Sequence, residues 1–387
     1  LLLADEGLLT LKEVFTDGTK IESFAGRYTF VWGNAIKTRK EKMVTQLEEM
    51  WEYAQSIAED EDKDPEPPKF KKLDKATVTK AAEKINSILK NKKTADPKMK
   101  AKARYIKNNF VENLEKYEEQ EKILNGRNSY SKTDPDATFM RMKDDHMQNG
   151  QLKPGYNVQI SSENQFIVNY TLHQQTTDYH TLKPHLEQHE ELYQSNPEEL
   201  TADAGYGSEE NYEMLQQKGI TSYVKYNTFD KELGSAKSKK KKKTDFSKDQ
   251  LYYNSEEDYY TCPKGQQMDK VGETKRRTKS GYQQQVSKYQ AKNCEGCHMR
   301  SSCFKGKGNR IVERNHQLED YKKTARERLL SEIGTKKRMQ RTADVEPVFA
   351  HIKSNRNFKR FTLKGIEKAE IEFGLHALAH NIKKKRA

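Results

Sequence analysis

The first part of the chain shows the residue pattern of β-strands. Residues 14 to 32, VFTDGTKIESFAGRYTFVW, are rich in β-branched and aromatic side chains around an Asp-Gly pair. Asp-Gly is a strong turn signal, and runs of this kind bounded by turns are typical of strands. The pattern therefore predicts a strand, a turn at Asp17 and Gly18, and a second strand.

Two helical segments follow this first pair of strands. From about 36 to 56 and from about 76 to 125, Glu, Lys, Ala and Leu dominate, and apolar residues recur at spacings of three and four, as at Ile85, Ile88 and Leu89. The charged, proline-bearing segment 56 to 74 separates them and has the composition of a linker. We expect a helical hairpin inserted into another fold.

Strand and helix patterns then alternate. GYNVQIS (155 to 161) and QFIVNYTLH (165 to 173) suggest a hairpin, and a polar helix from about 180 to 193 follows. LTADAGYG predicts a short strand ending at Asp203, Ser208 is a suitable cap for the next helix, and TSYVKY predicts another strand. This order predicts a mixed α/β sheet flanked by helices.

The remaining sequence divides into an irregular segment and a helical one. Residues 227 to 318 hold a lysine run, Lys239 to Lys243, together with all four cysteines, so we interpret them as a second insertion. The predicted division is first strands of a catalytic core in 1–35, a helical insertion in 36–128, core in 129–226, a Cys/Lys-rich insertion in 227–318, and C-terminal core helices in 319–387.

Composition narrows the possible partners. The 387 residues are 33% hydrophobic and 33% charged, which predicts a modest core with solvated arms. The net charge of +13 favours a polyanionic partner, and nucleic acid is a better candidate than a membrane surface.

No segment approaches the roughly 18 apolar residues of a spanning helix. The acids of LLLADEGLL are unlike a signal peptide. We expect a cytoplasmic protein with a segment preceding residue 1.

Three acidic residues stand outside the charge runs. Asp17 lies in FTDGT, Asp203 in TADAGYG and Glu346 in ADVEPVFAHIK. Convergent carboxylates suit Mg²⁺ or Mn²⁺, and two such ions about 3.5–4 Å apart can promote an in-line phosphoryl transfer. The alternative is structural: the aspartates would cap turns, and Glu346 would be a favourable acid in the first turn of a helix.

The sequence around these acids resembles a known family. FTDGTKIES, TDPDATFMRMK with GYNVQI, TADAGYGSEENY, and VEPVFAHIK followed by FTLKG and HALAHNIKK are similar, in that order, to the DDE transposases of bacterial insertion sequences. The resemblance is to the branch with a Tyr, Arg, Glu, Lys signature, and it extends from Asp17 to Lys383. It implies a ribonuclease-H-like fold, shared with retroviral integrases, with Asp17, Asp203 and Glu346 as the catalytic and metal-binding residues.

The same resemblance implies DNA contacts on the last of these motifs. Lys353 follows Glu346 with six residues between, as the signature requires. The strict Arg and Tyr positions hold Thr342 and Met339, and Arg341 lies one residue away from the Arg position. We therefore take Lys353 and Arg341 as candidate DNA-binding residues and leave the Tyr role unassigned.

The implied function is metal-dependent cleavage at the ends of a mobile element, followed by strand transfer. The implied partners are double-stranded DNA, as terminal inverted repeats and as target, and a second copy of the chain, since two ends must be held together. Association with the bacterial nucleoid follows. The alternatives are an inactive or repurposed DNA-binding remnant, a metal-dependent nuclease, and a zinc-stabilised structural module.

Cysteines and histidines offer further candidate metal ligands. Cys262, Cys294, Cys297 and Cys303 could bind one structural Zn²⁺, with His298 able to replace one of them, or could be reduced free thiols. His185 and His189 share a helix face but lack the neighbouring Glu of a metalloprotease motif, so we expect them on a solvated helix. For Lys239 to Lys243 we expect a disordered loop that attracts DNA secondarily.

Overall fold

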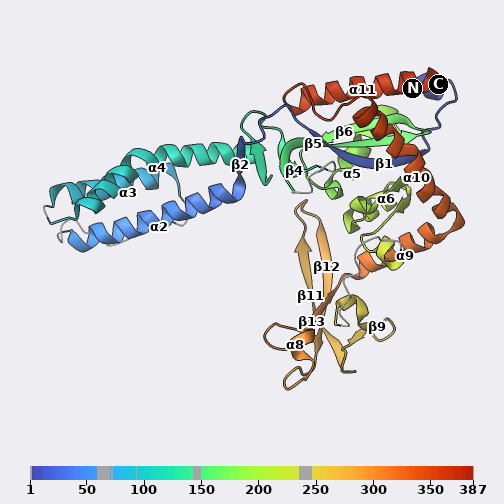
Figure 1. The fold of residues 1–387 in the computed structure, drawn as a ribbon. Coiled ribbons are helices and arrows are strands. Elements are labelled where there is room, and N and C mark those ends of the chain that lie inside the picture. The colour runs from blue at the N-terminus through green and yellow to red at the C-terminus, as the bar shows by residue number, and fades with distance from the viewer. Residues whose placement is uncertain are drawn as a thin grey trace.

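A computed structural model describes residues 2–58, 70, 73–92, 94–142, 150–234 and 246–386. Figure 1 shows a central α/β body with a long helical arm on one side and a smaller β-rich unit beneath it. The lysine run at 239–243 and most of the linker at 56–74 lie outside the described residues. Within the described part of the chain, no helix is long and apolar enough to cross a membrane.

The central body is built on a six-stranded mixed sheet. Its strands are β1 (Glu13–Glu22), β4 (Thr138–Arg141), β5 (Leu152–Glu163), β6 (Phe166–His173), β7 (Glu199–Ala202) and β8 (Thr221–Val224). They follow the order β4-β5-β1-β7-β8, with β6 also paired to β5. The β5–β6 hairpin confirms the prediction. The mixed sheet is consistent with the ribonuclease-H-like fold that the resemblance implies.

Strand β1 corrects the first prediction, because no turn forms at the Asp-Gly pair. β1 runs through Asp17 and Gly18 and pairs antiparallel with β5 on one side and parallel with β7 on the other. Its neighbouring residues Val14 and Phe15 are buried in two different hydrophobic clusters, one on each face of the sheet. Ladder bonds on both edges and burial on both faces outweigh the local turn preference of two residues.

Helices cover both faces of this sheet (Figure 1). On the face of Val14 the packing helices are α5 (Leu182–Tyr193), α6 (Glu209–Gln217) and α9 (His316–Leu330). On the face of Phe15 they are α10 (Glu332–Ala350) and α11 (Ile366–Arg386). The short helices α1 (Leu2–Asp5) and α7 (Phe229–Glu232) complete the body. Ser208 caps α6 as predicted, since its side chain accepts from the Asn211 amide.

The helical arm has its own core. It consists of α2 (Gly33–Ile57), α3 (Lys75–Asn91) and α4 (Pro97–Leu124), and it is joined to the body beside the small β2 (Phe30–Trp32) and β3 (Ser129–Ser131) pair. The single helix predicted from 76 to 125 is wrong, because the chain breaks before Pro97. The Asp96 side chain accepts from the Lys98 amide, and a proline suits the first position of a helix.

The β-rich unit was not predicted as a sheet. It contains β9 (Tyr252–Asn254), β10 (Tyr259–Thr261), β11 (Gln267–Arg277), β12 (Gln283–Ala291), β13 (Ile311–Arg314) and the short helix α8 (Arg300–Cys303). Its antiparallel order is β13-β12-β11-β10-β9. Much of β11 is exposed and polar, so the alternation that marks a half-buried strand is missing.

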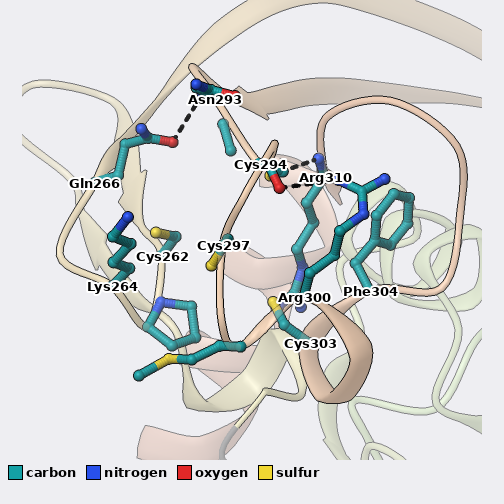
Figure 2. Close-up of a pocket in the computed structure, with 13 residues that line it drawn as sticks. Cys262, Lys264, Gln266, Asn293, Cys294, Cys297, Arg300, Cys303, Phe304 and Arg310 are labelled. Carbon is teal, nitrogen blue, oxygen red and sulfur yellow. Dashed lines mark hydrogen bonds between the residues drawn. The ribbon is translucent and has the colours of Figure 1, made fainter.

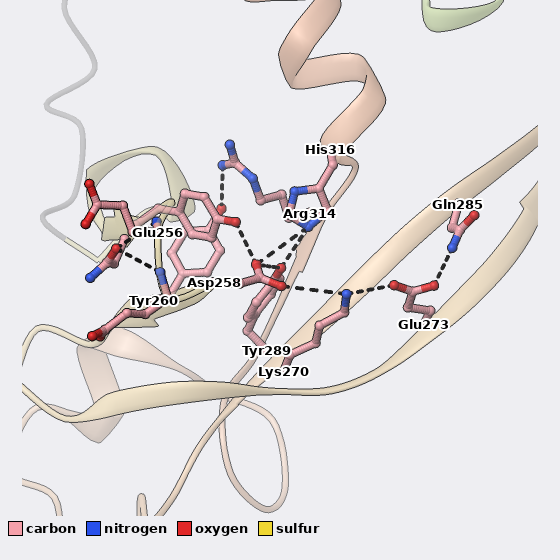
Figure 3. Close-up of polar contacts among 12 residues, drawn as sticks. Glu256, Asp258, Tyr260, Lys270, Glu273, Gln285, Tyr289, Arg314 and His316 are labelled. Carbon is pink, nitrogen blue, oxygen red and sulfur yellow. Dashed lines mark hydrogen bonds and ion pairs between the residues drawn. The ribbon is translucent and has the colours of Figure 1, made fainter.

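A network around Asp258 stabilises this unit (Figure 3). The hydroxyls of Tyr253 and Tyr289 both donate to the Asp258 carboxylate, which also pairs with Lys270 at 3.6 Å. The Arg314 guanidinium lies 3.8 Å from the centre of the Tyr253 ring. These contacts connect β9, β11, β12 and β13 where the apolar core is small.

The α9–α10 junction decides where α10 lies on the sheet. The Ser331 hydroxyl accepts from the Gly334 amide at 3.0 Å, and a Cβ on Gly334 would lie 1.9 Å from the Arg328 carbonyl oxygen. A side chain at 334 would therefore force the two helices apart.

Replacing Gly334 with Ala should lower the free energy of unfolding by about 1–3 kcal/mol, because backbone rather than a flexible side chain must shift. Denaturant unfolding monitored by circular dichroism measures the change. Gly33→Ala is the matched control, since its nearest new neighbour would be a Leu124 side-chain atom at 3.5 Å. Equal stability of the two variants would contradict this account of the junction.

Candidate active site

Parallel pairing of β1 with β7 brings the two predicted catalytic aspartates together. The last register pair is Thr16 with Ala202, so Asp17 and Asp203 are the next residues on adjacent strands. Asp203 follows the end of β7 as predicted. Asp17 was expected at a strand end and instead lies within β1, where it is buried. The two carboxylates therefore belong to the same part of the sheet.

A third aspartate lies beside Asp203 and was missed. Asp178 begins a short 3₁₀ helix, Asp178–His180. A Cβ built on Gly205 would lie 2.9 Å from Asp203 Oδ1 and 3.1 Å from Asp178 Oδ2, so the two carboxylates flank this glycine. Nothing in the local sequence TTDYH distinguishes Asp178 from other surface acids, and only the tertiary structure reveals it.

Glycines and amides shape the space around Asp178. A Cβ on Gly18 would lie 2.4 Å from Gln159 Nε2 and 3.0 Å from Asp178 Oδ1. Asn157 Nδ2 and Gln159 Nε2 donate to Asp178 Oδ1 at 2.7 and 3.1 Å. Glycine at 18 thus leaves room for the Gln159 amide, which a side chain at this position would displace.

The negative charge of this cluster affects the pKa of a neighbouring tyrosine. Tyr206 is fully buried and donates its hydroxyl to Gln159 Oε1. Burial, together with the negative charges of Asp178, Asp17 and Asp203, holds the pKa of Tyr206 well above its usual range, and Arg341 opposes this shift. The pKa of this one buried phenol therefore depends on the charges of all three acids and of Arg341.

Helix α10 carries the remaining predicted residues past these acids. Arg341 Nη1 lies 3.2 Å from Asp17 Oδ2, although Arg341 does not occupy the strict signature position. Lys353 is buried and its Nζ donates to Thr19 Oγ1 at 3.3 Å. Glu346 lies between these two contacts along the chain, and its side chain is exposed. The segment that holds Glu346 therefore runs beside Asp17 and Thr19.

The path of α10 depends on a proline and a buried acid. Pro347 cannot donate to the Ala343 carbonyl, which instead accepts from Gln165 Nε2 at 3.0 Å. The Asp344 carboxylate accepts from Ser162 Oγ at 2.5 Å and from the Gln165 amide at 3.1 Å, and burial raises its pKa. A π-helical turn, His351–Asn355, follows. The β5–β6 turn thus holds the helix that presents Glu346.

The donor atoms of the site are of the chemical type that a hard divalent cation prefers. Asp17, Asp203 and the neighbouring Asp178 offer carboxylate oxygens, the ligands that Mg²⁺ and Mn²⁺ prefer. Among the described residues, however, no three Asp, Glu, His or Cys side chains stand close enough to hold a metal ion. One oxygen of Asp17 faces Arg341. Metal binding would require these side chains to rearrange.

Two histidines expected on a solvated helix are buried instead. His185 and His189 lie on the side of α5 that packs against the sheet. His185 Nε2 bonds Ser161 Oγ at 2.8 Å, and His185 Nδ1 bonds Thr171 Oγ1 at 2.8 Å. The prediction failed because His185 finds hydroxyl partners in the interior of the sheet, and His189 is buried against the Tyr193 ring.

This polar chain reaches the strand of Asp17. Ser161 Oγ bonds Thr16 Oγ1 at 2.8 Å, and at the other end Thr171 Oγ1 bonds His173 Nε2 at 2.7 Å. Burial lowers the pKa of His185 to about 3 and that of His173 to about 4. Both rings are therefore neutral near pH 7 and act as hydrogen-bonding parts of the core.

The comparisons with known proteins bear on the second half of the chain. Residues 261–385 match the family model of the transposase DDE domain. This part of the chain is similar to the transposase DDE domain. The match includes Arg341, Glu346, Lys353 and all four cysteines, whereas Asp17 and Asp203 precede it. It supports a DDE transposase, as the resemblance implied. No match was found among the curated proteins or the solved structures.

The family gives the site a coarse function. A transposase acts on DNA, and DDE transposases generally depend on a divalent metal.

The buried histidines should make the stability of the protein depend on pH. Their folded pKa values lie below the unfolded value near 6.5, so the unfolded chain binds more protons and stability falls as pH drops from about 6.5 toward 4. Each ring contributes a slope of at most about 1.4 kcal/mol per pH unit.

Replacing His173 with Gln, which can still bond Thr171, should remove one such slope from the stability profile between pH 6 and 5. Denaturant unfolding at several pH values measures it. His298→Gln is the exposed control. An unchanged slope in His173→Gln would show that this ring does not titrate on unfolding.

Proposed function

We propose that this chain is a DDE transposase that cleaves DNA at the ends of a bacterial insertion sequence and joins the freed strand to target DNA. The observation that carries the proposal is the adjacency of Asp17 and Asp203 on paired strands, beside a helix that bears Glu346 within the family-matched segment. We assign the chain to the branch with the Tyr, Arg, Glu, Lys signature, with Lys353 in the Lys role.

Asp17, Asp203 and Glu346 would hold Mg²⁺ or Mn²⁺. When bound, such ions supply Lewis acidity at the scissile phosphate and lower the pKa of the attacking hydroxyl or water. The protein's part is positional. Gly18 and Gly205 keep space open beside the acids, and Asp344 fixes the helix that bears Glu346.

Arg341 and Lys353 are the proposed phosphate contacts. Both cations lie along β1, at Asp17 and Thr19, on the side covered by α10. In the absence of DNA, Arg341 neutralises part of the charge of Asp17. A phosphate entering the site offers the guanidinium a second, bidentate partner, which Arg geometry favours.

The proposed partners are double-stranded terminal inverted repeats, target DNA and a second copy of the chain, at the nucleoid in the bacterial cytoplasm. The net charge of +13 supports a DNA partner. So does the tip of the β11–β12 hairpin, where Lys275, Arg277 and Lys279 are exposed. We further propose that 36–128 and 227–318 are insertions into a core formed by 1–35, 129–226 and 319–387.

Replacing Asp203 with Asn should reduce metal-dependent cleavage of an inverted-repeat duplex by at least about 10³-fold, because a carboxylate ligand becomes a neutral amide. DNA affinity, measured by fluorescence anisotropy, should change little. Asp320→Asn on the exposed face of α9 is the matched control.

Three results separate the alternatives. Retained cleavage by Asp203→Asn would contradict the assigned site. Cleavage without strand joining would indicate a nuclease, and DNA binding without either activity in the wild-type protein would indicate a remnant. Asp178→Asn, tested beside Asp203→Asn, shows whether the missed acid also contributes to cleavage.

For the four cysteines we propose one structural Zn²⁺. They come from the turn after β10, the loop after β12 and helix α8, and Figure 2 shows them around one cavity of about 30 Å³. All four are free and half-buried. Cys262 opens a tight turn in which its carbonyl accepts from the Gly265 amide at 2.8 Å, a conformation that suits a metal-binding knuckle.

The surroundings of these thiols suit a negatively charged centre. Arg310 Nη1 donates to Cys303 Sγ at 2.8 Å, and the Arg310 amide donates to Cys294 Sγ at 3.3 Å. Four thiolates around Zn²⁺ carry a net charge of −2, which Arg310, Arg300 and Lys264 at the cavity can offset. Zinc must draw the sulfurs together, because no three of them converge in the described structure.

The full chain should therefore contain about one zinc per molecule by plasma mass spectrometry, and Cys297→Ser should lose it. Removing zinc with a chelator should lower the melting temperature of the wild-type protein. Ser301→Ala, on the neighbouring α8, is the control. Four thiols that react freely in a metal-free protein of unchanged stability would exclude the site.

A further inference from the structure

Helix α11 buries one face and exposes the other. Its inner face packs on β6, where Phe373 lies against the Tyr170 ring and Asn381 bonds the backbone of Ile167. The outer face carries four large apolar side chains in solvent, namely Ile371 (62% exposed), Leu375 (63%), Leu378 (57%) and Ile382 (55%). A continuous apolar row of this kind on a protein surface is typical of an interaction site.

The spacing of these four residues matches a helix-pairing seam. Successive members are four, three and four residues apart, which keeps them in one line along an α-helix. Figure 1 shows α11 along the outer edge of the body, away from the β-rich unit. The row is therefore accessible to another helix along its length.

The row and its flanking charges are symmetric about the middle of the helix. If a second α11 lies antiparallel, Ile371 faces Ile382 and Leu375 faces Leu378 across the seam, and the reverse pairs form by symmetry. The same register places Glu367 opposite Arg386 of the other copy. A parallel arrangement would instead place each charged residue against the same residue of the second chain. Two Lys368–Lys385 pairs oppose these two attractive pairs, but a parallel arrangement would set all four charged positions against like charges, so charge favours the antiparallel orientation.

We propose that α11 pairs with α11 of a second copy of this chain, antiparallel and about a two-fold axis. The pairing buries the apolar row formed by Ile371, Leu375, Leu378 and Ile382. It needs neither DNA nor metal and does not rest on the proposed catalytic function. Lys368 and Lys385 also face each other at the ends of the seam, where both can extend into solvent, and Lys385 already pairs with Glu6 at 2.6 Å.

The expected strength follows from the size of the contact. A 21-residue helix is about 30 Å long, and one helix pair buries less than the roughly 800 Å² per partner of a standard interface. We therefore expect association that depends on protein concentration.

Analytical ultracentrifugation of the full chain in EDTA, without DNA, tests the pairing from about 1 to 100 µM. The wild-type protein should shift from monomer to dimer over this range. The double variant Leu375→Ser, Leu378→Ser should remain monomeric, whereas Leu192→Ser, at a 54% exposed position on α5, should associate like the wild type. Circular dichroism melting verifies that each variant is folded.

A charge exchange tests the orientation. Glu367→Lys and Arg386→Glu should each weaken association at low salt by several-fold, and the combined variant should restore it, because each residue then again faces its opposite. A monomeric wild-type protein, normal association of the Leu375/Leu378 variant, or failure of the combined variant to recover would each overturn the antiparallel pairing. None of these outcomes depends on the cleavage assay.

Discussion

The position of β1 between β5 and β7 is the constraint on which the site depends. Hydrogen bonds on both edges and apolar contacts on both faces hold β1 at the centre of the sheet. Because the strand is straight at Asp17, this carboxylate lies beside Asp203 on the next strand. A turn at the Asp-Gly pair would have separated them. A strand secured on four sides can tolerate a cluster of like charges that would destabilise a freer segment.

The second constraint is the placement of α10. Ser162 and Gln165 at the β5–β6 turn donate hydrogen bonds to the Asp344 carboxylate and the Ala343 carbonyl. The Ala343 carbonyl is the one that Pro347 leaves without its helical donor. Lys337 pairs with Glu13 and Glu199 at the start of β1 and β7, and Arg341 pairs with Asp17 further along. Polar contacts therefore set the register of this helix on the sheet, in addition to the apolar packing beneath it.

The charges of the site are compensated locally rather than by the protein as a whole. Asp178 receives amide donors, Asp17 faces a guanidinium, and the phenol of Tyr206 stays protonated beside them. Exposed cations lie elsewhere, as on the β11–β12 tip, which the hydroxyls of Ser280 and Tyr282 connect to Glu210 and Glu213 on α6.

The sequence alone determined the mixed α/β class, the β5–β6 hairpin, the long helices, the strand ending before Asp203 and the transposase resemblance, because these follow from local periodicity and short motifs. It did not determine the straight path of β1, the burial of His185 and His189, or the sheet of the β-rich unit. It gave no signal for Asp178. Those features depend on which partners a segment meets across the fold, and hydrogen bonds or burial supplied by residues far along the chain outweigh local preferences of a few residues.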